Sequence, residues 1–298
     1  MCSCFCQNAT QQSEKSRAKI GCGVDLFGGV HMIPKVIHYC WFGGNPLPIT
    51  ARDCIESWRL SCPDYEIIEW NESNFDVNAI PYTAGAYKDK KWAYVTDYAR
   101  LKIVYEHGGI YLDTDVEVLK SLDPFLEHKA FFGTQSPGVV ATGLGFGAEA
   151  GTELLKELMA GYEHRPYFTE NGESAAAVCV EIDHAVFQKW GIKPENRIQQ
   201  VADATIYPVE YFNPKDYETG QILTTDNSYS IHHYHASWHS KGDARMRRKM
   251  MKLIQKYGRV EGKQRFGRWY NRRKVILGVQ RHGIRGAARK FKNRLMHT

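Results

Sequence analysis

Two aspartates one residue apart, Asp113 and Asp115, are the side chains whose types and spacing best fit a chemical role. They follow an apolar run at residues 110–112, which predicts that they stand at the mouth of a buried strand. Two adjacent carboxylates repel each other unless a cation neutralises them. Oxygen ligands of this kind select Mg²⁺ or Mn²⁺ rather than zinc, and such an ion keeps positions open for phosphate oxygens. The pair therefore predicts a metal-bridged diphosphate, with the metal as a Lewis acid on a departing nucleotide.

Asp97 and Arg100 lie in the segment before the aspartate pair. Apolar residues recur every three or four positions over residues 93–107, which predicts a helix that ends at the glycines in positions 108 and 109. Asp97 and Arg100 then share one helical face. A carboxylate there can reach sugar hydroxyls, and a guanidinium can reach phosphate or the other carboxylates. The alternative is a structural ion pair that fixes the helix to the sheet.

A second group of polar side chains lies in residues 230–240, SIHHYHASWHS, where four histidines fall within eight positions. Alternation along a strand would place His233 and His235 on the same side, where two imidazoles can meet one ion or phosphate. For each histidine, a purely structural role is the alternative.

The elements that must position these residues follow a β-α-β order. After the glycines, β-branched and aromatic residues predict one strand over residues 110–118, with Tyr111, Asp113 and Asp115 on one side. Trp41 would stand at the carboxyl end of a first strand, where ligands collect in open α/β sheets, although it could equally be a core or rim aromatic. Further predicted strands cover residues 33–41, 65–70, 130–134, 205–212 and 228–233, and further helices cover residues 49–61, 152–162 and 174–190.

Length and composition limit how the 298-residue chain can be divided into domains. We predict a disordered leader or upstream extension at residues 1–31, a catalytic domain at 32–242 and a basic amphipathic helical tail at 243–298. No stretch reaches the roughly 20 apolar residues that span a bilayer, and residues 1–31 lack a secretory signal. The cysteines include no C-x-x-C pair, which argues against a zinc site. We therefore expect a cytoplasmic protein.

The basic residues are concentrated in the tail. From Arg245 to Thr298 there are 19 Lys and Arg against one acid, Glu261. Because residues 245–298 carry +18 and the whole chain +6, the remainder carries −12. Basic amphipathic helices of this kind rest on anionic membrane surfaces, which is the favoured interpretation. Packing on the body with solvated charges and non-specific binding of nucleic acid are the alternatives, and no specific nucleic acid is expected.

Five segments in order carry a family resemblance: IPKVIHYCWFGG, SWRLSCPDYEIIEW, TDYARL, GGIYLDTDVEVLKSLDPF and IHHYHASW. Together they resemble glycosyltransferase family 32, the DXD-containing sugar transferases that include bacterial capsular-polysaccharide enzymes and yeast mannosyltransferases. The resemblance covers roughly residues 32–240 and extends more distantly to the catalytic domain of the large clostridial glucosylating toxins. It implies a GT-A type, Rossmann-like α/β fold that binds a nucleotide sugar, a divalent ion (Mn²⁺ or Mg²⁺), and retention of anomeric configuration.

The same resemblance implies roles for individual residues. The predicted catalytic residues are Asp97, Arg100, Asp113, Asp115 and Trp238. The predicted donor-binding residues are Trp41 at the base, Asp97, Arg100 and Tyr111 at the sugar, and Asp113, Ser237 and Trp238 at the diphosphate. The predicted metal ligands are Asp113, Asp115 and His235.

The function that follows is a metal-dependent retaining glycosyltransferase in surface polysaccharide synthesis. It would move a sugar from a nucleotide-sugar donor, with UDP favoured over GDP, to a glycan or lipid-linked oligosaccharide acceptor. The protein would be peripheral on the inner face of the cell membrane. No second carboxylate pair fits the nucleophile and acid that most glycosidases need, which favours transfer over hydrolysis. The alternatives are a metal-dependent phosphohydrolase, which needs no sugar acceptor, and a basic nucleic-acid-binding protein.

Overall fold

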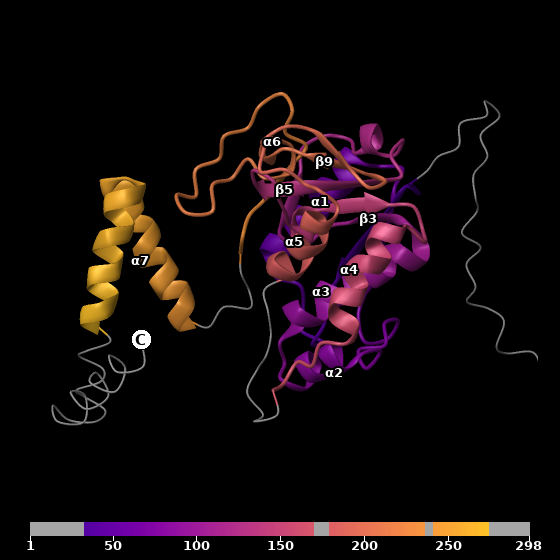
Figure 1. Cartoon of the computed structure of the whole chain (residues 1–298), viewed down its shortest axis with the longest axis horizontal. Coiled ribbons are helices and arrows are strands. Elements are labelled where there is room, and N and C mark those ends of the chain that lie inside the picture. Colours follow the sequence, from indigo (N-terminus) through magenta and orange to yellow (C-terminus); the bar gives the residue numbers. More distant parts are fainter. Residues whose placement is uncertain (1–32, 170–178, 236–240, 274–298) are drawn as a thin grey trace, which may run out of the picture. The chain divides into compact units, whose positions relative to one another are not determined.

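The computed structural model describes residues 33–169, 179–235 and 241–273 (Figure 1). The predicted leader at residues 1–31 therefore lies outside the described residues. The strands are β1 (Val36–Cys40), β2 (Glu66–Trp70), β3 (Gly109–Tyr111), β4 (Val116–Val118), β5 (Ala130–Ser136), β6 (Val139–Val140), β7 (Phe146–Ala148), β8 (Gln199–Val201), β9 (Ala204–Tyr207) and β10 (Ser230–His232). The helices are α1 (Ile49–Ser61), α2 (Pro81–Lys88), α3 (Trp92–His107), α4 (Glu153–Glu163), α5 (Cys179–Lys189), α6 (Val209–Phe212) and α7 (Lys241–Tyr257), with short 3₁₀ turns at Asp123–Phe125 and Thr142–Leu144.

The main sheet has the strand order β2-β1-β3-β7-β5-β9-β8, and β6 pairs with β5. Strand β1 runs parallel to both β2 and β3, so that Ile37 stands opposite Ile67 on one side and Ile110 on the other. Strand β7 is antiparallel to its neighbours β3 and β5. The carboxyl ends of β1 and β3 therefore meet at one edge, which is where open α/β sheets bind ligands.

Both faces of the sheet are packed. Successive side chains of a strand point to opposite faces, and in β5 Phe131 and Phe132 belong to two different apolar clusters. The Phe132 cluster contains the buried side of α3 together with α4 and α5, and the Phe131 cluster contains Trp58 from α1. Figure 1 shows α3, α4 and α5 gathered together. The α/β class, the Rossmann-like β-α-β order and the helical C-terminal region are confirmed, an arrangement consistent with the GT-A type.

The predicted single strand over residues 110–118 is wrong at its centre. Strand β3 ends at Tyr111, and residues 112–115 form a turn in which the Val116 N–H donates to the Asp113 carbonyl over 3.0 Å. Aspartate favours such turns because its short polar side chain competes for local backbone groups. Strand β4 then pairs antiparallel with β10 in a separate two-stranded sheet, with Val116 opposite His232. The break therefore brings the histidine segment to the aspartate pair.

The other differences also have local causes. The strand predicted over residues 205–212 ends at Tyr207, because Pro208 lacks an N–H for a strand ladder and instead precedes α6. Helix α2 and the short strands β6, β7 and β8 were not predicted. The helices predicted at 49–61, 93–107 and 152–162 are confirmed to within one residue at each end. For the helix predicted over 174–190, α5 is confirmed from Cys179, and residues 170–178 lie outside the described part.

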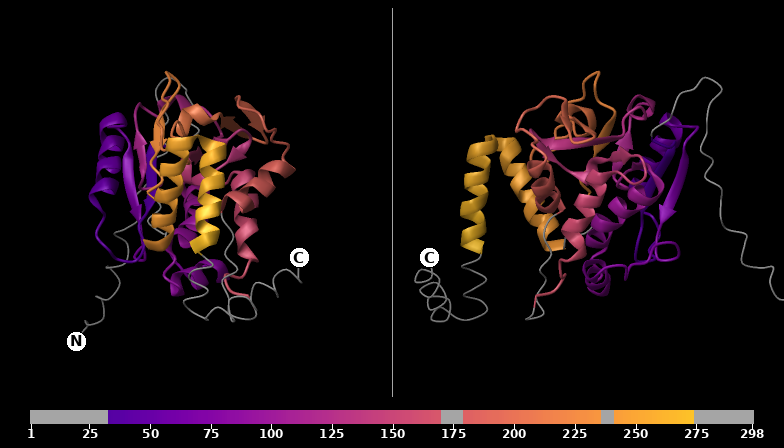
Figure 2. Two further views of the ribbon diagram at one scale, coloured as in Figure 1. Left: turned by 90° about the vertical axis from the view of Figure 1, so that its left-hand side faces the viewer. Right: turned by 45° about the vertical axis from the view of Figure 1, so that its right-hand side comes forward.

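The tail is helical over the residues that the structure describes. Helix α7 ends before Gly258, which has a positive φ of 77°, and residues 259–273 form a second helical segment. Figure 2 shows the two side by side in both views. A Cβ added at Gly262 would lie 2.5 Å from Ile254 Cα, so glycine allows the close contact of the two backbones. Among the described residues, no helix is both long and apolar enough to span a membrane. The domain boundaries at residues 31 and 243 stay predictions.

Candidate functional site

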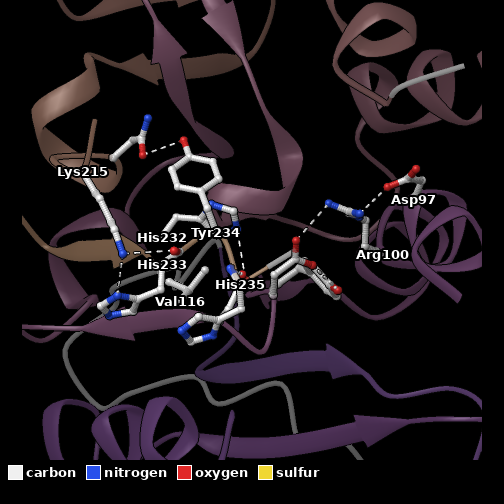
Figure 3. A network of polar contacts seen from close by, with 12 residues as sticks. Asp97, Arg100, Val116, Lys215, His232, His233, Tyr234 and His235 are labelled. Carbon is white, nitrogen blue, oxygen red and sulfur yellow. Dashed lines mark hydrogen bonds and ion pairs between the residues drawn. The ribbon is translucent and has the colours of Figure 1, made fainter. Parts of the chain in front are cut away.

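Helix α3 carries a buried ion pair toward the aspartates. The Arg100 guanidinium contacts the Asp97 carboxylate through Nη2, one helical turn away, and both side chains are less than one tenth exposed. Arg100 Nη1 lies 3.7 Å from Asp113 Oδ2 (Figure 3). Within the described residues Nη1 has no hydrogen-bond partner, although it is buried. The predicted shared face of Asp97 and Arg100 is confirmed, and it leaves one strong donor unused beside the aspartate pair.

Asp113, Asp115 and His232 form the cluster that can hold a metal ion. One ligand atom from each lies within 4.8 Å of the others. His232 Nε2 is 3.0 Å from Asp115 Oδ1, and the Tyr111 hydroxyl donates to Asp113 Oδ1 over 2.8 Å. The three side chains of the cluster are 26%, 17% and 13% exposed, so an ion can reach them from solvent. Carboxylates suit Mg²⁺ and Mn²⁺, so the two aspartates fit the predicted kind of ion, and His232 adds one imidazole.

The two aspartates are in different electrostatic environments. Burial raises the pKa of Asp113, an effect that Arg100 opposes and the Asp115 charge reinforces. Burial would also raise the pKa of Asp115, but His232 and the His235 N–H outweigh it and hold that pKa well below its usual value. Asp115 is therefore stably ionised, whereas the charge on Asp113 gains most from a nearby cation.

Two groups of the histidine segment lie beside Asp115, the His232 ring and the His235 backbone N–H. The His235 backbone N–H donates to Asp115 Oδ2 over 2.8 Å, while its ring stacks on His233 at 5.6 Å. The predicted common side of His233 and His235 is thus confirmed, and it is the His232 ring that lies in the ligand cluster. Metal binding by the His235 side chain stays a prediction. Ser237 and Trp238 lie outside the described residues.

Trp41 follows the last residue of β1, at the predicted edge of the sheet. It is half-buried, and its Nε1 donates to the Asn45 carbonyl over 2.6 Å. The turn that contains Asn45 therefore holds the indole in place. Its role at a nucleotide base stays a prediction.

Sequence reasoning missed a buried carboxylate, Asp183 on α5. It accepts hydrogen bonds from Thr142 Oγ1 at 2.9 Å and from the Tyr162 hydroxyl at 3.1 Å. Burial raises its pKa to about 6. Burial also raises the pKa of Asp97 to about 7, with Asp183 adding to the effect and Arg100 opposing it. A lone acid in an amphipathic helix gives no sequence signal of this kind, because the helix pattern does not say which neighbours it meets.

The glycine-rich segment at residues 142–148 borders one side of the site. A Cβ on Gly143 would lie 2.6 Å from Asp113 Oδ2 and 3.0 Å from Arg100 Nη1. Only a residue without a side chain allows the backbone to come this close to both groups. Gly143 therefore fixes the space around the Arg100 and Asp113 pair.

Part of the chain is similar to known proteins. Residues 48–132 match the family described as "Glycosyltransferase sugar-binding region containing DXD motif". The chain is 30% identical over 154 residues to inositol phosphoceramide mannosyltransferase 3 of Schizosaccharomyces pombe, covering 46% of this chain and 41% of the relative. It is 25% identical over 201 residues to mannosyl phosphorylinositol ceramide synthase CSH1 of Saccharomyces cerevisiae, covering 61% and 51%.

Among solved structures, the PaToxG glycosyltransferase aligns with a TM-score of 0.41 and 15% identity, over 53% of this chain and 69% of that one. The chain spans about half or less of the length of the two yeast relatives. The matched region at 48–132 contains α3 and the Asp113 and Asp115 pair. That region is similar to the sugar-binding region of glycosyltransferases that contain a DXD motif.

Proposed function

We propose that the chain is a metal-dependent retaining glycosyltransferase that moves a sugar from a nucleotide sugar to a glycan or lipid-linked acceptor. The observation that carries this proposal is the meeting of Asp97 and Arg100 with the Asp113, Asp115 and His232 cluster at the carboxyl edge of the sheet. Each group suits one part of a nucleotide sugar. The match of residues 48–132 to a sugar-binding region supports the same assignment.

Each side chain has a defined task in this mechanism. Asp113, Asp115 and His232 would hold Mn²⁺ or Mg²⁺, which supplies positive charge that stabilises the departing diphosphate. Tyr111 fixes Asp113 by its hydrogen bond, and the His235 N–H fixes Asp115. Arg100 is held by Asp97, so its unused Nη1 is oriented in advance and can donate to the donor sugar or phosphate.

Transfer then needs an acceptor hydroxyl near the sugar and few competing waters. The bond between the anomeric carbon and the diphosphate oxygen breaks as the bond to the acceptor oxygen forms. The acceptor proton passes to the departing phosphate oxygen, and attack occurs on the face from which that phosphate leaves. This stereochemistry follows the family 32 resemblance.

The names of the two yeast relatives guide our choice of acceptor class. Both carry names that describe mannosyl transfer to a ceramide bearing an inositol phosphate. We therefore favour a lipid-linked acceptor in surface glycan or capsular polysaccharide synthesis. UDP remains the favoured nucleotide, with GDP-mannose as the competitor. The +18 tail suits a peripheral position on an anionic membrane, at the cytoplasmic face.

A screen of UDP- and GDP-sugars with Mn²⁺, read as nucleotide release, tests the proposal. One donor should give release that EDTA abolishes and that the double variant Asp113→Ala/Asp115→Ala lowers by at least about 100-fold, because a metal Lewis acid supplies several kcal/mol. Asp226→Asn, an exposed acid, is the matched control and should retain full release. Full turnover by the double variant would refute the proposal. Release of inorganic phosphate with no sugar acceptor would indicate a phosphohydrolase instead.

A further inference from the structure

A pocket of about 240 Å³ lies beside the metal cluster, between the loop at residues 215–220, the segment at 233–235 and α7. Its lining includes the cations Lys215, Arg247 and Arg248, the rings of His233 and His235, and the single acid Asp216. None of these residues took part in the donor site except His235, through its backbone. The pocket therefore has its own chemistry.

Its positive charge is largely uncompensated. Asp216 Oδ1 accepts the backbone N–H groups of Glu218 and Thr219 at 2.9 and 2.7 Å. Its Oδ2 pairs with Arg259, which lies beyond α7. Burial and the neighbouring Arg247 lower the pKa of Lys215, a shift that a bound anion would reverse. Two arginines and Lys215 thus line the pocket, while its one carboxylate is used elsewhere.

The Arg247 guanidinium is held in position. Its Nη1 donates to the Tyr234 carbonyl over 2.8 Å, and its centre lies 4.1 Å from the middle of the Tyr217 ring. Its Nε is buried and has no hydrogen-bond partner within the described residues. Lys215 is also oriented, since its Nζ donates to the His233 carbonyl over 3.0 Å. Fixed donors of this kind lose little entropy when they bind an anion.

The pocket and the metal cluster share one segment of chain. His232 turns into the cluster, whereas His233 contacts Lys215 Nζ at 3.3 Å through Nδ1. Figure 3 shows Lys215 and His233 at one end of this network and Asp97 and Arg100 at the other. A ligand in the pocket would therefore lie beside the metal, on the side away from the predicted sugar end of the donor.

We propose that this pocket binds the phosphate group of the acceptor. The volume is below the roughly 300–1,000 Å³ of sites for drug-sized ligands, so it suits one phosphate and its nearest atoms rather than a nucleotide. Arginine and lysine match phosphate oxygens in charge and geometry. The pocket would hold the acceptor by its phosphate and leave a hydroxyl free to face the metal. This inference rests on the proposed glycosyltransferase function and adds an anionic acceptor to it.

Calorimetric titration of the full chain with glycerol 3-phosphate tests the pocket directly. EDTA is present so that no metal binds the phosphate, and glycerol is the uncharged counterpart. We expect glycerol 3-phosphate to bind and glycerol not to bind. Arg247→Gln and Arg248→Gln should each weaken binding about tenfold, the effect of one charge-assisted hydrogen bond or close charge. Arg248 is exposed, and among the described residues it makes no hydrogen bond or ion pair, so its variant remains informative if Arg247→Gln loosens the helix.

Lys252→Gln is the matched control, because Lys252 is an exposed cation on the same helix that does not line the pocket. Equal binding by the wild type and both arginine variants would overturn the proposal, as would an equal loss in the control. A second titration with UDP or GDP and Mn²⁺ separates the sources of phosphate. If the arginine variants weaken nucleotide binding as much as glycerol 3-phosphate binding, the pocket holds the donor, and the acceptor proposal is wrong. A negative donor screen combined with selective glycerol 3-phosphate binding would refute the glycosyltransferase function alone.

Discussion

At the scale of single residues, the site depends on close approach as much as on ligand chemistry. Asp97, Arg100 and Asp113 form a chain of opposite charges in which the central guanidinium is 4% exposed. Gly143 borders this chain at a distance that no other residue type permits. The four residues come from α3, from the turn after β3 and from a 3₁₀ turn. Their alignment is therefore sensitive to a single added methyl group.

Gly143→Ala should impair metal-dependent donor turnover while the fold survives. The new Cβ would lie 2.6 Å from Asp113 Oδ2, so Asp113 or the backbone must move. We expect the apparent KM for Mn²⁺ to rise by about tenfold or more, because a 1 Å misplacement in a site can cost about 100-fold in rate. Gly267→Ala is the control, since its Cβ would meet no atom within 4 Å. An unchanged Mn²⁺ dependence in Gly143→Ala would show that the aspartates tolerate the shift.

Asp183→Asn should stabilise the protein at neutral pH. Burial raises the folded-state pKa of Asp183 from 3.8 to about 6, so the folded state binds this proton more tightly than the unfolded state. Its stabilising contribution is complete below about pH 3.8 and is lost as the pH rises through about 6. The loss at pH 7 is at most about 3 kcal/mol. Asparagine has no charge to bury, and its one carbonyl oxygen can accept from one of the two hydroxyls of Thr142 and Tyr162 while its NH2 group donates to the other.

Urea unfolding at pH 4 and pH 7 in EDTA measures this effect. The free energy of unfolding of Asp183→Asn should exceed that of the wild type at pH 7 and approach it at pH 4. Asp226→Asn, at an exposed position, should show no such dependence. A difference that does not vary with pH would mean that Asp183 is ionised at little cost.

At the scale of elements, periodicity and glycine predicted the helices well. Helix α3 could be predicted because its apolar repeat stops at Gly108, whose φ of 67° suits the end of a helix. The break between β3 and β4, at the aspartate pair, could not be predicted, because residues on both sides of it favour β-structure equally. It depends on the pairing of β4 with β10, which joins residues about 116 positions apart. Local patterns carry no information on such a register.

Because local patterns carry no information on strand register, the sequence did not single out His232 as the histidine of the ligand cluster. The rings of His233 and His235 do lie together, but both residues follow β10 and Tyr234 between them has a positive φ of 56°, so strand alternation is not the cause. Only the antiparallel register sets His232 opposite Val116 and beside Asp115. The Asp113 and Asp115 pair, Tyr111 and the α3 ion pair were visible from sequence because they lie within one local stretch. The sequence did not reveal the roles of Asp183, of Gly143 or of the pocket that Arg247 lines, since each acquires its neighbours only in the folded chain.

The paired helices of the tail offer a test at this scale. Gly262→Ala would place a Cβ 2.5 Å from Ile254 Cα and force the two backbones apart. We expect faster limited proteolysis by trypsin after the lysines and arginines of residues 245–273. Gly267→Ala lies in the same helical segment without a close neighbour and should be cut at the wild-type rate. Equal rates for both variants would indicate that the close contact does not stabilise the pair.

At the scale of the whole molecule, opposite charges are separated along the chain. Residues 245–298 of the tail carry +18 and the remainder of the chain −12. Part of the tail is used internally, because Arg259 pairs with Asp216 and Lys263 pairs with Glu218. These contacts favour the interpretation that residues 259–273 pack against the loop that carries Asp216 and Glu218. They leave the cations beyond residue 273 as candidates for a membrane surface.

Truncation after Arg273 should weaken binding to vesicles that contain anionic phospholipid. It removes seven Lys and Arg and no acid, and each cation near such a surface contributes about 1 kcal/mol. Co-sedimentation with anionic and neutral vesicles at two salt concentrations measures the change. Binding of the full chain should fall with salt, because the attraction is screened. If truncation leaves vesicle binding intact, the membrane contact lies elsewhere in the chain.

The two-stranded sheet of β4 and β10 would link ion binding to the local stability of the fold. Such a pair is only marginally stable by itself, yet it brings Asp115 next to His232 and the His235 N–H. An ion held by both strands would act as a cross-link, and its concentration would set how often the pair separates. Divalent ion and local fold would thus depend on each other, so that loss of the ion exposes the amides of residues 116–118 and 230–232 to hydrogen exchange before the main sheet opens.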